Sequence, residues 1–286
     1  MPVHRMASNW AFLIIDPFRI DELPEGCGAA ALVPFGLENE AHLMPQIVCL
    51  RQLDPSQQDT VSDWIERHAN SPDTSSAFIF ADGQANEERL LSHLRRGLVV
   101  WLSRAQRCLL RYYDPGVFRH FEWLFDDAQL AAFCGPLTRW LFCDEGRWRT
   151  LVKPDVAHAP VLRFDKQLSA RLGRIGALNS VFQELELPAA PHESIALFRQ
   201  ADGYLARAQA KGWQSEADWV AFTQLCLECH PRFDEHPRVV RLLKQIDEDD
   251  CAFADAICAV DDEFWQTVAD ELSAETSQTQ QRDITS

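Results

Sequence analysis

The chain has 286 residues, 47% of them hydrophobic, and a formal net charge of -16. This length and apolar content are enough for one large or two modest domains with proper cores, which excludes disorder of the whole chain. The excess of acidic residues argues against nucleic acid as a partner, because phosphate binding requires clustered cations.

The sequence also predicts where the protein works. No apolar run approaches the roughly 18 to 20 residues needed to span a bilayer, so we expect no membrane insertion. The first residues lack the basic region and small-residue cleavage site of a secretory signal. Nine cysteines are scattered through apolar segments, which is typical of reduced, core-filling thiols. We therefore expect a cytoplasmic protein.

The first half of the chain, residues 1–152, is predicted to be one domain. Asp54-Pro55 with Gln57 starts one helix and Asn86 caps another. We expect an α+β or α/β domain with a mixed sheet and flanking helices, since some neighbouring strands form hairpins and others require helical crossovers. The strand candidates are 10–15, 46–53, 77–80, 97–102, 107–112, 137–143 and 147–152.

Helix-boundary residues are concentrated between Leu94 and Trp148. Gly97 is predicted to be the C-cap of the helix that starts at Glu87. Asp114-Pro115 starts a helix that should run to about Phe125, and the capping pair Asp126 and Gln129 starts another that stops at Gly135-Pro136. We expect the tryptophans of this segment to lie in the core, namely Trp101, Trp123, Trp140 and Trp148.

The second half is predicted to be helical. Residues 153–162 form a linker, because two prolines bracket a segment without periodicity. Apolar stripes at helical spacing then predict a lobe of about five helices over residues 163–272. Residues 273–286 lack such a stripe, so we expect a disordered tail.

The chain carries no recognisable catalytic motif. The run from Cys226 to His230 matches the short pattern of covalent haem attachment, and zinc is a second alternative if Cys251 or Cys258 comes close. Cys226 and Cys229 share a helical stripe with Trp219 and Phe222, so core packing is the preferred interpretation. We expect no cofactor, no metal and no enzymatic activity.

A run of acidic residues stands out near the C-terminus. No Lys or Arg occurs from Gln245 to Gln281, whereas this segment holds eleven carboxylates. Asp247, Glu248, Asp249 and Asp250 could steer a basic partner toward this face. The simpler alternative is a solvated acidic face that keeps the protein in solution.

The order of segments in the N-terminal half resembles a known family. It contains NWAFLIID (residues 9–16), a strand after LRR, RYYDP (residues 111–115), two helices, GPLTRW and an aromatic hairpin. Over roughly residues 8–150 this resembles the effector-adaptor, or effector-chaperone, family of type VI secretion. The residues that carry this motif are Arg95, Gly97, Arg111, Tyr112, Asp114, Pro115, Gly135, Pro136 and Trp140.

The resemblance implies a function. Members bind a toxic effector and load it onto the VgrG spike, so we expect a non-enzymatic adaptor whose partners are one effector and VgrG. Arg111 and Asp114 either brace the strand-to-helix turn or contact the effector. The alternative is an immunity-type or other interaction module that masks a toxin.

Overall fold

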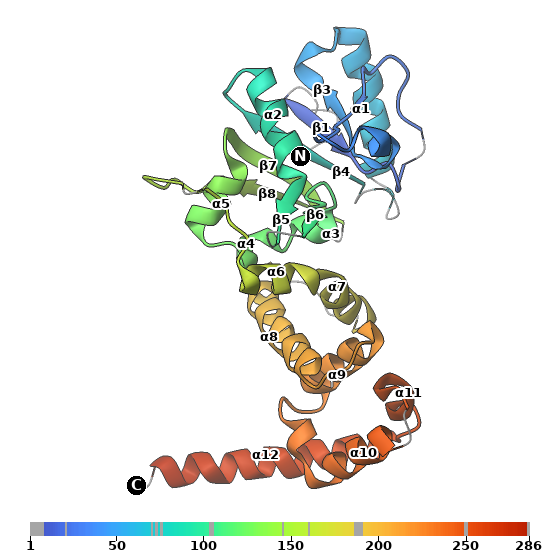
Figure 1. Ribbon diagram of the computed structural model, residues 1–286, viewed down its shortest axis with the longest axis vertical. Coiled ribbons are helices and arrows are strands. Elements are labelled where there is room, and N and C mark those ends of the chain that lie inside the picture. Colours follow the sequence, from blue (N-terminus) through green and yellow to red (C-terminus); the bar gives the residue numbers. More distant parts are fainter. Residues whose placement is uncertain are drawn as a thin grey trace. The chain divides into compact units, whose positions relative to one another are not determined.

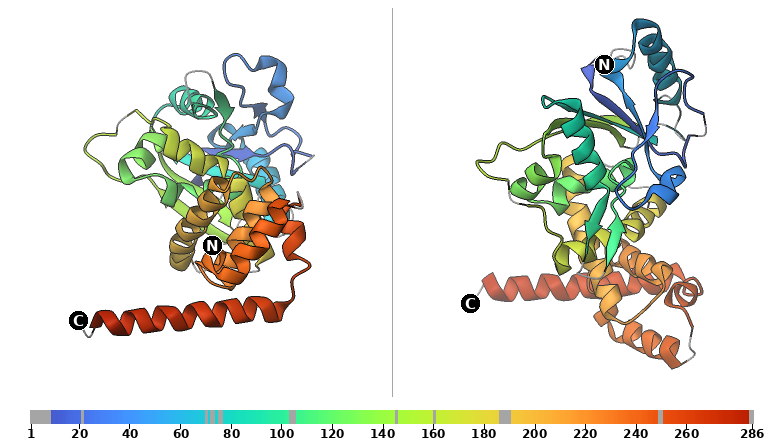
Figure 2. Two further views of the ribbon diagram at one scale, coloured as in Figure 1. Left: turned by 60° about the horizontal axis from the view of Figure 1, so that its bottom comes forward. Right: turned by 45° about the horizontal axis from the view of Figure 1, so that its top comes forward.

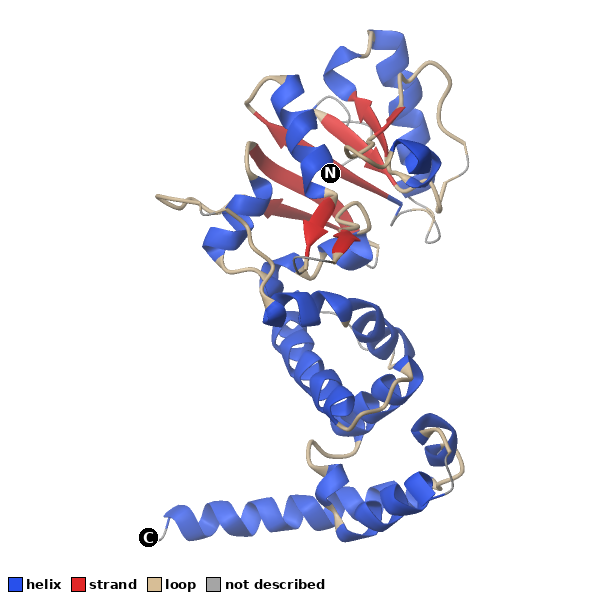
Figure 3. Cartoon of the chain, viewed as in Figure 1, coloured by secondary structure: helices blue, strands red, loops and turns tan. Residues whose placement is uncertain are grey.

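The chain forms two compact units, and each is described by itself. The computed structural model describes residues 9–284 except for residues 21, 70, 72, 73, 75, 76, 103–105, 145, 160, 186–190 and 249–250. The units are Met1–Ala170 and Arg171–Ser286. In the described residues, strands occur in the first unit and the second is helical (Figures 1 and 3). The expected class, an α+β domain followed by a helical lobe, is confirmed.

A six-stranded sheet forms the centre of the first unit, with strand order β2-β3-β1-β4-β7-β8. Every residue of β1 and β4 is buried, as expected for strands covered on both faces. The strands are β1 (Phe12–Ile15), β2 (Ala30–Ala31), β3 (Gln46–Cys49), β4 (Phe78–Gly83), β7 (Leu137–Asp144) and β8 (Arg147–Val152).

The sheet is antiparallel at each described pairing, so the prediction of a mixed sheet is wrong. The crossover from β3 to β4 does join two strands of the same direction. However, β1 lies between them and pairs with both. This split arrangement places an antiparallel neighbour on each side of β1, which spacing along the sequence does not reveal.

Helices and a small second sheet flank the six-stranded sheet. A further two-stranded sheet pairs β5 (Val99–Trp101) with β6 (Arg107–Leu109). The helices of this unit are α1 (Pro55–Ala69), α2 (Glu87–Gly97), α3 (Pro115–Phe118), α4 (Phe121–Leu124) and α5 (Asp127–Cys134), with 3-10 helices at Glu38–Leu43 and Leu50–Gln52. Lys166–Gly173 forms α6, which crosses the boundary between the units.

The N-caps that the sequence predicts at Asn86, Asp114 and Asp126 are present. Asn86 accepts a hydrogen bond from the Arg89 amide, and Asp126 and Gln129 form a capping box. The helix predicted from Pro115 to Phe125 is instead two short helices, because the chain breaks at Arg119 and His120.

Gly97 is not a left-handed C-cap. It is the last residue of α2, and Leu98 after it keeps right-handed helical angles. A Cβ on Gly97 would lie 3.5 Å from Tyr112 Cε1, which is an ordinary van der Waals contact, so the packing of Tyr112 does not by itself require a glycine here.

The sheet has a core on each face. On one face α1 packs through Val61, Trp64 and Ile65 against a cluster that includes Leu13 and Phe80. On the other face an aromatic cluster surrounds Phe118, whose ring centroid lies 5.2 Å from that of Trp140 and 5.0 Å from that of Phe142. Its other members include Tyr112, Phe121, Phe125 and Phe133.

The second unit is a set of helices around an apolar core. A buried ion pair, Arg174 Nε to Asp202 Oδ1 at 2.7 Å, lies near its beginning. Phe222, Phe233 and Phe253 lie in the core. The helices are α7 (Ile175–Glu184), α8 (Pro191–Ala210), α9 (Glu216–Glu228), α10 (Pro237–Glu248), α11 (Phe253–Ile257) and α12 (Asp262–Ile284), with a 3-10 helix at Phe233–Glu235.

Two domain predictions differ from the structure. The linker was expected at residues 153–162, but the chain divides after Ala170. Phe164 packs on Phe125 of the first unit, which explains why this segment belongs there. Residues 273–286 were expected to be disordered, yet α12 continues to Ile284 (Figure 2). No Gly or Pro interrupts it, and its Ala, Glu and Gln residues favour helix.

Gly135 provides a test of packing between α2 and the turn before β7. Its φ is +55°, and an added Cβ would lie 2.7 Å from His93 Nδ1. The ring cannot move freely, because His93 Nε2 bonds the Phe133 carbonyl at 2.7 Å. We expect Gly135→Ala to destabilise the first unit by about 2–3 kcal/mol, the sum of backbone strain and a lost hydrogen bond. Hydrogen exchange of β4 and β7 amides measures this loss.

Gly146→Ala is the matched control. Gly146 also has a positive φ, +76°, but nothing lies within 4 Å of its added Cβ. Gly146→Ala should therefore lower the stability of the first unit by only about 1 kcal/mol, from backbone strain alone. Against a His93→Ala background, Gly135→Ala should fall to a similar cost; equal costs for both glycines in the native background would contradict the packing argument.

Candidate partner-binding surface

Arg111 joins the end of β1 to the start of α3. Its Nη2 lies 3.0 Å from Asp16 Oδ2 and 3.3 Å from Asp114 Oδ2. The Asp16 side chain is fully buried, and its Oδ1 accepts a hydrogen bond from the Phe18 amide. We call Asp16, Arg111 and Asp114 the Arg111 ion bridge.

Asp114 has a second role in this bridge. Its Oδ1 accepts a hydrogen bond from the Gly116 amide at 2.9 Å, and Pro115 occupies the first turn of α3. The sequence analysis anticipated a link between Arg111 and Asp114 but not the contact with Asp16, which lies 95 positions earlier in the chain. The bridge therefore anchors the strand-to-helix turn to the central sheet.

The ion bridge raises the pKa of Arg111. Burial by itself would lower the pKa of Arg111, but the nearby Asp114 and Asp16 carboxylates more than offset it and raise that pKa. Even so, 45% of the Arg111 side chain remains exposed. A partner carboxylate or carbonyl can reach that exposed part.

The other motif residues have mostly structural surroundings. Tyr112 is buried, its hydroxyl donates to the Leu94 carbonyl at 2.9 Å, and its ring packs edge-on against Trp140. Burial raises the pKa of Tyr112 well above its usual value, so this hydroxyl stays protonated. Gly135 and Pro136 form the turn between α5 and β7. Arg95 is exposed in the last turn of α2.

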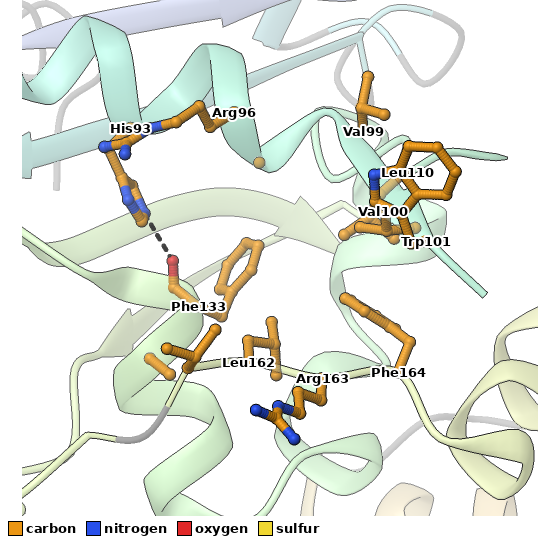
Figure 4. A pocket seen from close by; sticks show the side chains of 13 residues that line it. His93, Arg96, Val99, Val100, Trp101, Leu110, Phe133, Leu162, Arg163 and Phe164 are labelled. Atoms are coloured by element: carbon orange, nitrogen blue, oxygen red, sulfur yellow. Dashed lines mark hydrogen bonds between the residues drawn. The ribbon is translucent and has the colours of Figure 1, made fainter. Parts of the chain in front are cut away.

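An apolar groove lies beside this motif, in the first unit (Figure 4). It is bounded by α2, β5, α5 and the segment 161–164, and its volume is about 450 Å³. His93 and Arg96 contribute from α2, Trp101 from β5, and Phe133 from α5. We call it the Trp101 groove.

Trp101 is the residue that sequence reasoning misplaced. We expected it in the core, but 58% of its surface is exposed, whereas Trp123 and Trp140 are buried and Trp148 is partly buried against the core. Val100 is buried and Trp101 is not, which is the alternation of a strand covered on one side. Val161, also in the groove, is 82% exposed. Exposed aromatic and aliphatic side chains gathered at a groove are typical of protein-binding surfaces.

The acidic segment is only partly described. Glu248 is exposed at the end of α10, while Asp249, Asp250 and the Asp247 side chain lie outside the described residues. The segments that follow, α11 and the start of α12, present further exposed carboxylates at Asp255, Asp261, Asp262, Glu263 and Asp270.

The cysteine pair of the second unit belongs to its core. Cys226 is buried beside Phe222, and burial raises the pKa of its thiol to about 12. The Cys229 thiol contacts the Trp265 carbonyl at 3.4 Å. In the part of the chain that the structure describes, no three His, Cys, Asp or Glu side chains gather as a metal site.

Among the helices of the described residues, none combines the length and apolar composition that a membrane crossing requires.

Comparison with known families gives one match. Residues 11–132 match the model of a family described as a domain of unknown function, DUF4123. No curated protein and no solved structure matches the chain. The matched range contains both β1 and the RYYDP motif, and hence all three residues of the Arg111 ion bridge.

The ion bridge leads to a prediction about stability. Among the described residues, Arg111→Gln leaves the buried Asp16 carboxylate with Arg19, at 3.9 Å, as its remaining ion-pair partner. We expect a loss of about 2 kcal/mol, between the values for exposed and buried pairs, because Arg111 is half exposed. In a double-mutant cycle Asp16→Asn should recover about 1 kcal/mol of that loss. Hydrogen exchange of the β1 amides measures the free energy of unfolding of each variant.

Arg67→Gln is the control for that cycle. Arg67 is exposed on α1 and bonds only the Asp63 carbonyl of its own helix in the described structure. It should change stability by less than about 0.5 kcal/mol. Additive effects of Asp16→Asn and Arg111→Gln would mean that the two residues do not stabilise each other.

Proposed function

We propose that this protein is a non-enzymatic adaptor that binds one type VI secretion effector in the cytoplasm and loads it onto the VgrG spike. The observation that carries the proposal is the family match at residues 11–132. It falls within the region whose RYYDP motif resembles the effector-adaptor family. The matched domain is associated with type VI effectors at the family level.

The surfaces of the chain support a binding role. The Trp101 groove combines an exposed tryptophan with two arginines, and tryptophan and arginine are among the residue types that contribute most binding energy at protein interfaces. Its position within the matched unit favours the effector as its occupant. In this proposal, the exposed part of Arg111 is a second contact for the same partner.

The acidic segment of the second unit is proposed to act in steering. A run of carboxylates that is uninterrupted by Lys or Arg along the sequence raises the local concentration of a basic surface and speeds its association. Asp247, Glu248, Asp249 and Asp250 would accordingly affect the rate at which a basic partner binds.

A three-way complex is the expected result that tests the adaptor function. We would co-express this chain with the effector and the VgrG protein encoded in the same gene cluster, and purify the mixture by size exclusion. All three should co-elute, and deletion of this gene should stop delivery of that effector while other effectors are still delivered.

The control separates an adaptor from an immunity protein. Expression of the mature toxin domain alone should kill cells whether or not this chain is present. Protection of those cells would support the alternative of a toxin-masking module. Normal delivery without this chain, together with no complex, would rule the adaptor function out.

The steering role has its own test. Replacement of Asp247, Glu248, Asp249 and Asp250 by the corresponding amides should slow association about 3-fold or more at low salt, with little effect near 0.5 M salt, where such fields are screened. Stopped-flow mixing with the partner that binds this unit measures the rate. Amide variants of four exposed carboxylates of the first unit, Asp59, Asp63, Glu66 and Glu88, are the matched control. Equal rates for both sets would contradict steering.

A further inference from the structure

We infer that the Trp101 groove binds an extended segment of a partner protein, in which apolar residues alternate with or adjoin Asp or Glu, as an added strand on β5. The inference rests on the proposed function only for the identity of the protein that carries the segment. It adds to that function the conformation and the chemistry of what is bound.

One edge of β5 has no partner strand among the described residues. Among the described strands, β5 pairs with β6 alone. The Leu110 amide donates to the Leu98 carbonyl at 2.8 Å, and the Leu102 amide donates to the Gln106 carbonyl at 3.0 Å. Because hydrogen-bonded positions alternate along an antiparallel pair, the peptide groups of Val99 and Trp101 face away from β6. An extended chain can bond these groups by strand addition.

The side chains beside this edge suit the apolar residues of such a strand. Val99, Trp101 and Val161 line the groove, and a strand places every second side chain on the same face. The volume of about 450 Å³ falls within the range of roughly 300–1,000 Å³ that is typical of small-molecule binding pockets, so several side chains of a peptide fit in it. Alternate side chains of a bound segment would therefore enter the groove.

The charges at the groove select an acidic segment. Arg96 and Arg163 line it, both are exposed, and neither forms a salt bridge with any residue that the structure describes. Within the described structure, the Arg96 side chain donates a hydrogen bond only to the Ser92 carbonyl of its own helix. In a chain with 43 acidic and 27 basic side chains, two arginines without carboxylate partners are available to an incoming Asp or Glu.

A second copy of this chain is a less suitable occupant. Each copy carries a net charge of -16, so two copies repel each other at long range. A partner segment with one or two carboxylates meets the arginines without that repulsion. Self-association is therefore an outcome that the experiment must detect separately.

Peptide selection tests the inference without knowledge of the partner. A phage-displayed library of random linear dodecapeptides would be selected on the full-length chain, with the Trp101→Ala chain used to remove peptides that bind elsewhere. We expect enriched peptides with apolar residues beside Asp or Glu. Failure to enrich an acidic and apolar consensus would overturn the inference.

The selected peptide then tests each contact. By fluorescence anisotropy, Trp101→Ala should weaken its binding about 10-fold or more, and Arg96→Glu or Arg163→Glu about 5-fold or more. Methylation of the peptide nitrogens whose N–H groups face β5 should also weaken binding about 10-fold. Methylation of the alternate nitrogens, whose N–H groups face away from β5, should not. An equal loss of affinity from methylation of either set of nitrogens would exclude strand addition.

Matched controls come from the same unit. Phe35 is 95% exposed and lies outside the groove, so Phe35→Ala should change affinity less than 2-fold. Arg67→Glu is the corresponding control for charge reversal. Sedimentation velocity adds a check on self-association: a dimer that Trp101→Ala converts to a monomer would assign the groove to a second copy and overturn the inference.

The outcome also separates this inference from the adaptor function. If the three-way complex forms and survives Trp101→Ala, Arg96→Glu and Arg163→Glu, only the groove assignment fails. If peptides bind the groove as expected but no complex with effector or spike forms, the adaptor function fails and the groove remains a binding site for extended acidic segments.

Discussion

The buried carboxylate of Asp16 is the constraint on which the first unit depends. A charged group without contact with water requires a nearby cation, and Arg111 supplies it from a position 95 residues later. The same guanidinium also contacts Asp114, which caps α3. The end of the central strand and the start of the helical segment are thereby fixed to each other, and the neighbouring Tyr112 is held in the aromatic cluster.

The proposed binding surface lies next to this anchored core. The α2 helix ends at Gly97, beside the ring of Tyr112, and the chain continues directly into β5. Val100 of β5 is buried, whereas Trp101 is exposed beside the groove. A strand that is anchored by its neighbours presents an open edge with little loss of conformational entropy on binding, which favours affinity.

The candidate site was only partly predictable. The motif residues Arg111 and Asp114 were recognised, and their mutual contact was anticipated, because both lie in one short segment. Asp16 was not assigned to them, since nothing in a single sequence indicates which distant carboxylate a strand end will approach. Trp101 was expected in the core because aromatic residues in strands are usually buried, but in the described structure β5 buries Val100 on one side and leaves Trp101 exposed on the other.

The sequence by itself determined the local features of this protein: the helix starts at Asn86, Asp114 and Asp126, the hairpin of β7 and β8, and the helical character of the second half. These depend on side chains that bond backbone groups a few residues away or on short-range periodicity. Only the tertiary structure decided the antiparallel order of the sheet, the ion bridge, the continuation of α12 and the Trp101 groove. For the sheet, the bridge and the groove, the reason is that they depend on which distant segments meet, and β1 between β3 and β4 is the clearest case.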